Sequence, residues 1–205
     1  MKKAFILLTL GVCLVSNLPG ENYLEMRATQ SQYRYVNFDH LFKNQMMFDF
    51  VYVGVPEDNE VNVGIGYLIQ PTDKLTIAPL LYANTTKEHP SLGFKPAMAV
   101  SYKTISWDTN LFGAFNADAT GPRGNYLVID PLEFNHKLGE HWWVGLSFGC
   151  LVQGEYRDFL AGPVLKRRDR GGWWSLTTRL GSVVEKSAKP ATSIYELRIS
   201  RAFDF

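Results

Sequence analysis

The chain has 205 residues, a formal net charge of +1, and 46% hydrophobic and 14% aromatic residues. This length suits a single domain. The near-neutral charge argues against a general nucleic-acid binder, which usually carries a large basic excess. A mean hydropathy near zero excludes a bundle of membrane-spanning helices.

The first twenty residues have the pattern of a secretory signal peptide. Two lysines precede an apolar run that is too short for an ordinary membrane span. We therefore expect residues 1–20 to be cleaved, after Ser16 or after Gly20. The run Leu10–Cys13 loosely resembles a lipobox, which would make Cys13 a lipidated N-terminus, although Val12 is a poor residue at that position.

Residues 21–45 alternate poorly between apolar and polar positions, and we leave them open as a strand, a short interfacial helix or a periplasmic lead-in. Residues 46–205 are regular and are predicted to form one β-barrel domain. Turns divide this domain into ten strand-like segments without a helix between them. The segments are Met46–Val55, Val61–Ile69, Leu75–Ala83, Phe94–Tyr102, Ile105–Phe115, Tyr126–Phe134, His141–Gln153, Tyr156–Leu165, Trp173–Val184 and Ser193–Phe205.

The segment His141–Gln153 shows the clearest alternation. Trp142, Leu146 and Phe148 fall on one face, which has no polar side chain, whereas Ser147 and Gly149 fall on a small, polar face. About ten residues with an apolar face turned outward and a polar face turned inward are typical of a transmembrane barrel strand. Cys150 falls on the apolar face and is predicted to be a packing residue.

The last segment repeats this alternation and ends in phenylalanine. Tyr195, Phe203 and Phe205 share one face with Leu197 and Ile199. This pattern resembles the C-terminal signature of bacterial outer-membrane β-barrels. The resemblance implies localisation in the outer membrane, delivery by the barrel assembly machinery, and Tyr195, Phe203 and Phe205 as the assembly signal.

The predicted fold is all-β: a closed antiparallel up-and-down transmembrane β-barrel of about ten strands, within a range of eight to twelve. With both termini in the periplasm, as in this family, the longest connections all fall outside the cell. These are Asn84–Ser91, Asn116–Asn125 and Glu185–Thr192.

Polar residues on the inward faces are the candidate functional residues. They either pair with one another and fill the interior or line a pore, and their mixed signs give no clear ion preference. The predicted lumen-lining residues are Asp49, Asn62, Lys95, Lys103, Ser106, Asp108, Asn110, Arg157, Glu196 and Arg198.

Tryptophans near strand ends are predicted to form an aromatic girdle at the membrane interface. They are Trp107, Trp142, Trp143, Trp173 and Trp174. The basic run Lys166–Gly172 beside them suits phospholipid head-group anchoring at the periplasmic edge, or is a solvated turn.

The predicted function is a structural or passive-transport protein, either a small porin-like channel or a closed barrel with binding loops. Outer-membrane lipid, lipopolysaccharide, the barrel assembly machinery and small solutes are its expected partners. No nucleic-acid partner, cofactor, metal site or catalytic residue is expected, since the sequence carries no phosphate loop, metal-ligand spacing or nucleophile elbow.

Two alternatives stay open. A barrel enzyme acting on lipid A or phospholipid would use His89 beside Glu88. A soluble, lipocalin-like periplasmic protein would turn its apolar faces inward around a ligand.

Overall fold

The computed structural model describes residues 20–29, 34–54, 59–86, 90–102, 105–115, 126–153, 156–185 and 192–203. Strands account for most of these residues. The strands are β1 (Gly20–Thr29), β2 (Arg34–Phe42), β3 (Met46–Gly54), β4 (Asn59–Tyr67), β5 (Ile69–Thr72), β6 (Leu75–Thr86), β7 (Pro90–Tyr102), β8 (Ile105–Phe115), β9 (Tyr126–Lys137), β10 (Trp142–Gln153), β11 (Tyr156–Asp169), β12 (Gly172–Glu185) and β13 (Thr192–Phe203). Within these ranges, we find no helix with the length and apolar character needed to cross a membrane.

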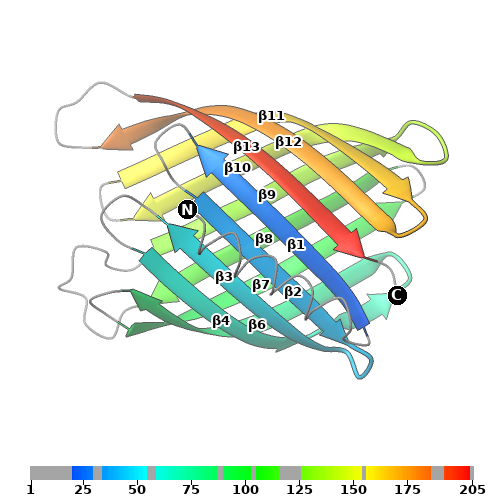
Figure 1. The fold of residues 1–205 in the computed structure, drawn as a ribbon, viewed down its shortest axis with the longest axis horizontal. Coiled ribbons are helices and arrows are strands. Elements are labelled where there is room, and N and C mark those ends of the chain that lie inside the picture. The colour runs from blue at the N-terminus through cyan, green and yellow to red at the C-terminus, as the bar shows by residue number, and fades with distance from the viewer. Residues whose placement is uncertain are drawn as a thin grey trace, which may run out of the picture.

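The strands form a closed antiparallel barrel (Figure 1). Long strands that follow one another in the chain are hydrogen-bonded neighbours, and β1 pairs with β13 to close the ring. The short β5 pairs only with β6, while β4 also pairs with β6 directly. The predicted up-and-down barrel is therefore confirmed. Within the described residues, twelve strands form its wall, and the short β5 is not counted among them.

The predicted count of about ten strands is too low because residues 21–45 contribute β1 and β2. The barrel wall begins at Gly20 rather than at Met46. Alternation is hard to recognise in β1 because bulky side chains, Tyr23, Glu25 and Arg27, take its inward positions. The signal-peptide residues before Gly20, Cys13 among them, lie outside the described ranges.

The two faces of the wall have opposite chemistry. Outward side chains such as Leu81, Leu146 and Leu180 are more than half exposed, whereas Asp49 and Ser147 on the inward face have no exposed surface. A soluble protein buries its apolar side chains and exposes its polar ones. This wall does the reverse, as a barrel in lipid requires, and so the soluble lipocalin-like alternative does not fit.

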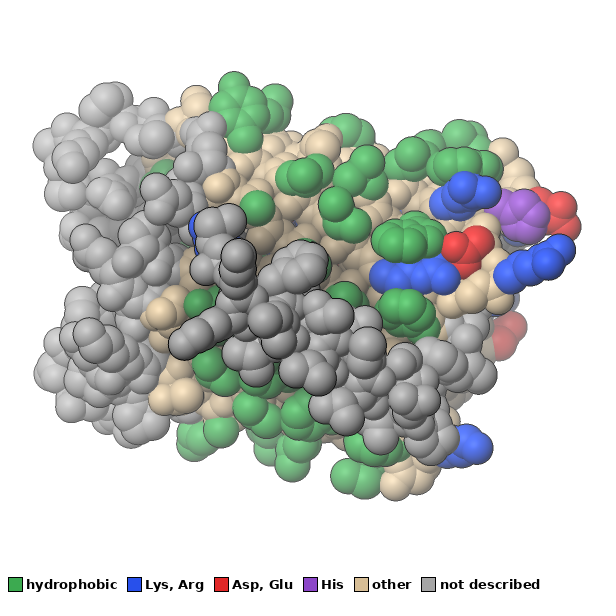
Figure 2. Space-filling view, in the orientation of Figure 1, with side chains coloured by type: hydrophobic (Ala, Val, Ile, Leu, Met, Phe, Trp, Pro, Cys, Tyr) green, Lys and Arg blue, Asp and Glu red, His purple; other side chains and the backbone are tan. Residues whose placement is uncertain are grey.

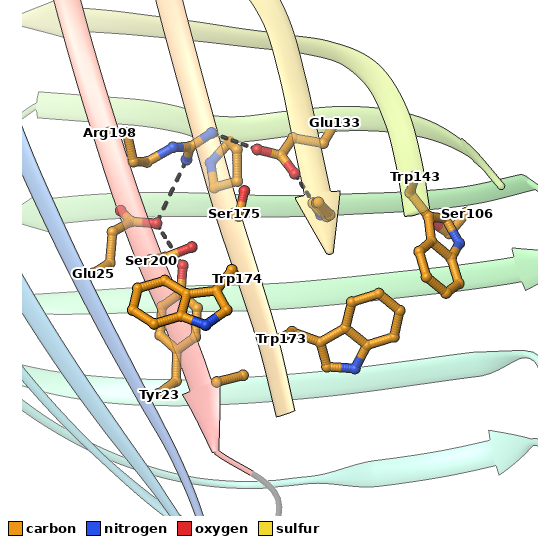
Figure 3. A pocket seen from close by; sticks show the side chains of 13 residues that line it. Tyr23, Glu25, Ser106, Glu133, Trp143, Trp173, Trp174, Ser175, Arg198 and Ser200 are labelled. Atoms are coloured by element: carbon orange, nitrogen blue, oxygen red, sulfur yellow. Dashed lines mark hydrogen bonds and ion pairs between the residues drawn. The ribbon is translucent and has the colours of Figure 1, made fainter. Parts of the chain in front are cut away.

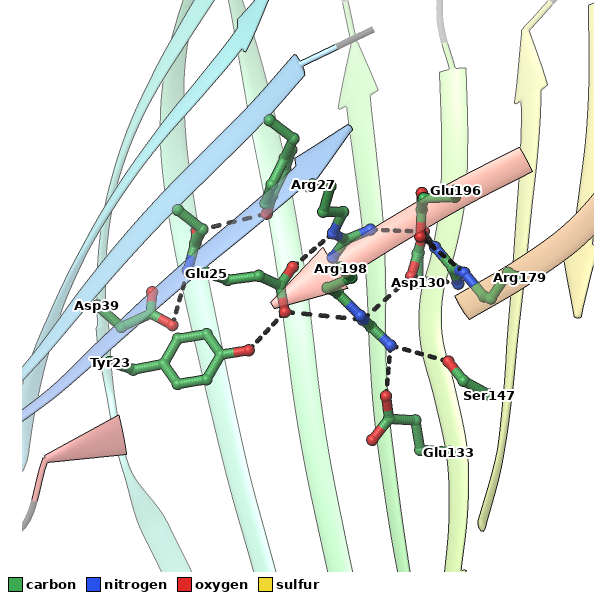
Figure 4. Close-up of polar contacts among 12 residues, drawn as sticks. Tyr23, Glu25, Arg27, Asp39, Asp130, Glu133, Ser147, Arg179, Glu196 and Arg198 are labelled. Carbon is green, nitrogen blue, oxygen red and sulfur yellow. Dashed lines mark hydrogen bonds and ion pairs between the residues drawn. The ribbon is translucent and has the colours of Figure 1, made fainter. Parts of the chain in front are cut away.

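One β-bulge in β9 explains why the facing of Tyr126–Phe134 is ambiguous in the sequence. Ile129 and Leu132 are three residues apart in β9. Their partners in β10, Cys150 and Phe148, are only two residues apart, and so are their partners in β8, so β9 contains one extra residue. Such an extra residue shifts the alternation from one face to the other. Both Asp130 within the bulge and Glu133 after it consequently point into the barrel (Figure 4).

The barrel has two distinct ends. Short connections, at residues 43–45, 138–141 and 170–171, join strands at one end, which we name the turn end. Residues 116–125 and 186–191 join strands at the opposite end, which we name the loop end. The last residue of β13 lies at the turn end (Figure 1).

Candidate functional site: the polar lumen

Small inward residues in one part of the wall make room for long charged residues of nearby strands. Gly149 in β10 lies opposite the guanidinium of Arg179: a Cβ atom there would be 2.5 Å from Arg179 Nη1 and 3.0 Å from Asp130 Oδ2. Gly162 in β11 is similarly crowded, since its Cβ would be 2.0 Å from the backbone oxygen of Thr178. Gly149 thus leaves room for charged groups to meet inside the barrel, whereas Gly162 allows β11 and β12 to approach closely.

A network of ion pairs crosses the lumen around Asp130 (Figure 4). Arg179 Nη1 and Nη2 donate to the two carboxylate oxygens of Asp130, at 2.9 and 2.8 Å. Arg27 Nη1 lies 2.6 Å from Asp130 Oδ2, and its Nε lies 2.5 Å from Glu25. Since β10 to β13 separate β9 from β1 in the ring, this pair joins distant walls. Glu196 completes the group by accepting from Arg179 Nε at 2.8 Å.

Arg198 forms a second crossing closer to the turn end. Its Nη2 donates to Glu133 and, at 2.8 Å, to Ser147 Oγ. Lys166 Nζ lies 2.7 Å from the other oxygen of Glu133. Because a partly broken buried network leaves charges unpaired at high cost, these paired side chains hold one another in place.

The opposite wall carries a third polar group around Asp49. Tyr82 and Lys95 both donate to its Oδ2 atom. The Tyr35 ring connects this wall to the first network, because the Arg27 guanidinium lies 4.3 Å from its centroid. Toward the loop end, the Tyr126 hydroxyl donates to Glu60 at 2.6 Å, which ties β9 to β4.

Apolar residues fill one side of the lumen toward the turn end. Ala78, Leu80 and Tyr82 form a buried cluster, with Met47, Leu68 and Ala97 packed against it. All of these lie between β3 and β7. This cluster occupies the lumen beside β3 to β7, and the open space in this half is lined by β1 and β8 to β13.

A cavity of about 390 Å³ lies on that open side (Figure 3). Glu133, Lys166 and Arg198 line it together with the rings of Tyr23, Trp143 and Trp173. The two indoles meet edge to face, with centroids 4.2 Å apart and planes at 67°. The cavity thus combines aromatic surface with both signs of charge and leads from the turn end up to the Arg198 crossing.

The structure places six of the predicted lumen residues on the inward side. They are Asp49, Asn62, Lys95, Ser106, Glu196 and Arg198. The prediction for Arg157 is wrong, because this exposed side chain alternates with the inward Asp158 and so faces outward. Lys103 and the side chains of Asp108 and Asn110 lie outside the described part of the chain, as do Glu88 and His89 of the enzyme alternative.

Two of the predicted interface tryptophans are also on the wrong face. Trp143 and Trp173 turn into the lumen, because they sit one residue away from the outward Trp142 and Trp174. Both inward indoles line the cavity, which Trp174 also borders. Trp142 and Trp174 are exposed at the turn end. Trp107 stacks on Phe134 of the outer wall at 6.2 Å. Tyr195 is exposed and Phe203 ends β13, whereas Phe205 lies outside the described residues.

The main members of the crossing network were not predicted. Glu25 and Arg27 fall in the segment left open, and Asp130 and Glu133 fall in the segment with the bulge. Arg179 lies in a predicted strand, on the same face as the inward Thr177. The signal that could have identified it is Gly149 of β10, two strands away in the wall, which leaves space for a long side chain.

Filling the space beside Arg179 should destabilise the barrel. Gly149→Val is expected to lower the free energy of unfolding by about 1–3 kcal/mol, because the new side chain displaces the Arg179–Asp130 pair. Urea unfolding, followed by heat-modifiable gel migration, measures the change. Ala161→Val adds bulk on the outward face of β11 and should leave the unfolding midpoint unchanged. Equal midpoints for both variants would contradict the crowding seen at Gly149.

The sequence matches no protein-family model and no curated protein sequence. Solved porins share the fold. The KdgM porin matches with a TM-score of 0.60 and 12% identity over 90% of this chain and 99% of that one. The KdgM porin in complex with disordered oligogalacturonate matches with a TM-score of 0.61, 12% identity and the same shares. The NanC porin matches with a TM-score of 0.61 and 11% identity over 90% of this chain and 100% of that one. At these identities the likeness establishes a barrel of porin architecture.

Proposed function

We propose that the protein is a porin-like channel of the bacterial outer membrane, with a narrow lumen that passes small polar solutes. The observation that supports this proposal is the polar lumen inside an apolar outer wall. Ion pairs cross this lumen, such as those of Asp130 with Arg27 and Arg179. Wide barrels leave an aqueous channel, whereas eight-stranded barrels are filled by side chains. A twelve-stranded barrel with crossing side chains lies between these cases and suits a constricted pore.

The turn end is proposed to face the periplasm and the loop end the exterior. Outer-membrane barrels have short periplasmic turns and longer extracellular connections, and the two longest connections between the strands of this barrel, residues 116–125 and 186–191, share one end. Outer-membrane lipid and lipopolysaccharide would then surround the wall. Delivery by the barrel assembly machinery is the proposed role of the terminal signal at Tyr195, Phe203 and Phe205.

The lumen charges favour neutral or cationic solutes over polyanions. Within the described side chains, carboxyl groups outnumber basic groups by one. The carboxyl groups are Glu25, Asp39, Asp49, Glu60, Asp130, Glu133, Asp158 and Glu196, and the basic groups are Arg27, Lys95, Lys137, Lys166, Arg168, Arg179 and Arg198. The KdgM porin has been solved with oligogalacturonate, an acidic sugar chain. A lumen with an acidic excess gives no comparable reason to admit such a chain.

Planar-bilayer recording tests the channel. The refolded protein, shown to be a barrel by heat-modifiable migration, should give a small single-channel conductance. Under a potassium chloride gradient, the reversal potential should show a modest preference for cations. A barrel that migrates as folded but gives no conductance would support instead the alternative of a closed structural barrel. A clear preference for anions would contradict the proposed solute class.

A further inference from the structure

Four outward side chains form a row around the outer wall at the turn end. Trp142 of β10 pairs in register with Arg167 of β11, and Arg167 pairs with Trp174 of β12. Trp174 in turn pairs with Arg201 of β13. Directly opposed residues on one face of a sheet have neighbouring side chains. The row Trp142–Arg167–Trp174–Arg201, which we name the rim ladder, therefore alternates indole and guanidinium groups over four strands.

The two arginines of the rim ladder differ in their pairing. Arg201 is held by Asp169, with Nη1 and Nη2 each donating at 2.9 Å, and Asp169 also accepts from the Trp174 indole at 3.0 Å. Arg167 is exposed and lies 5.3 Å from the centroid of the Trp142 ring. Within the described residues, no carboxylate forms an ion pair with Arg167. Its guanidinium is thus available to an anion from outside the chain.

The surroundings of Arg167 favour an anion that carries apolar chains. Two residues further along the strands, the next outward positions are Leu165, Leu176 and Ile199, and each is at least 40% exposed. The rim ladder therefore lies at the turn-end edge of the apolar band. Figure 2 shows the same arrangement, with Lys and Arg side chains at the turn end beside a band of hydrophobic ones. Exposed Arg170 adds positive charge close by.

We propose that the rim ladder binds the phosphate of an anionic phospholipid in the periplasmic leaflet of the outer membrane. Arg167 is the phosphate ligand, since a guanidinium offers paired N–H donors to phosphate oxygens. Trp142 and Trp174 flank the head group at the depth where indoles prefer to lie, and the leucine and isoleucine side chains contact the acyl chains. The inference rests on the proposed orientation, with the turn end in the periplasm, but not on channel activity.

Lipid retention on the purified barrel tests the proposal. The protein is placed in micelles that contain equal amounts of phosphatidylglycerol and phosphatidylethanolamine, and native mass spectrometry counts the lipids that stay bound. Wild type should retain phosphatidylglycerol in preference. Arg167→Gln should lower that retention about tenfold, as expected for the loss of one charge-assisted contact. Arg167→Lys should keep the preference with weaker binding, because the charge remains.

Arg157→Gln is the matched control, because Arg157 is an exposed, outward arginine of the same strand at the opposite end of the barrel. Its lipid retention should equal that of wild type. Unchanged phosphatidylglycerol retention in Arg167→Gln, or equal retention of both lipids by wild type, would overturn the proposal. Preferential binding of lipid A that depends on Arg167 would also overturn it, since that would assign the site to the outer leaflet. Lipid retention does not depend on conductance. A barrel without conductance would therefore contradict the proposed channel but not the proposed lipid site.

Discussion

Asp130→Asn is expected to destabilise the barrel by about 3 kcal/mol and to shift its ion preference toward anions. Removing one partner of a buried ion pair typically costs about 3–5 kcal/mol. The lower figure applies because Glu25 and Glu196 still pair with Arg27 and Arg179. The loss of one negative charge leaves both guanidinium groups less compensated at the crossing. Urea unfolding measures the first effect, and the reversal potential in a salt gradient measures the second.

Glu140→Gln is the control for this experiment. It removes the same charge from an exposed carboxylate in the turn 138–141, outside the lumen. Neither stability nor reversal potential should change in this variant. If Asp130→Asn behaves like Glu140→Gln, the crossing at Asp130 neither supports the barrel nor sets its selectivity.

Leu146→Arg is expected to destabilise the folded barrel in lipid by about 2–4 kcal/mol, as arginine does near the bilayer midplane. Leu146 points outward from the middle of β10 and is 54% exposed. Leu138→Arg is the matched control, because Leu138 is 61% exposed but lies beyond the strands at the turn end. Its replacement should change the free energy of unfolding by less than about 1 kcal/mol.

The comparison of these two leucines distinguishes a membrane barrel from a soluble one. Both side chains are exposed to a similar degree, so in water both substitutions would have similar, small effects. Only a bilayer makes the cost depend on depth. Unfolding in lipid vesicles, followed by heat-modifiable migration, provides the measurement. Equal effects at the two positions would contradict the transmembrane assignment.

The orientation of each regular strand was predictable because it depends on local alternation. The period of two alone predicts Leu146 and Phe148 on the outer face and Ser147 on the inner face. The prediction failed where alternation is interrupted or masked. Bulky residues such as Arg27 hide it in β1, and the inserted residue between Ile129 and Leu132 reverses it in β9. The strand count was low for the first of these reasons.

The tryptophan predictions show a second limit. Position near a strand end identified all five as rim residues, but the rim has an inner and an outer surface. Trp142 and Trp143 are adjacent, so one of them must face the lumen. The outward alternation of β10 already required this of Trp143. The alternation of side chains along the strand therefore predicts the direction of a tryptophan better than its position near a strand end does.

The sequence by itself determined that this chain forms an antiparallel barrel with an apolar exterior, because side-chain alternation in a strand is a local property of the backbone. Only the tertiary structure decided which charged side chains meet. Asp130, Arg27 and Arg179 come from strands far apart in the chain, and ring closure through the β1–β13 pairing brings them together. The crossing depends on the curvature of the whole wall and on the space left at Gly149, which no single segment encodes.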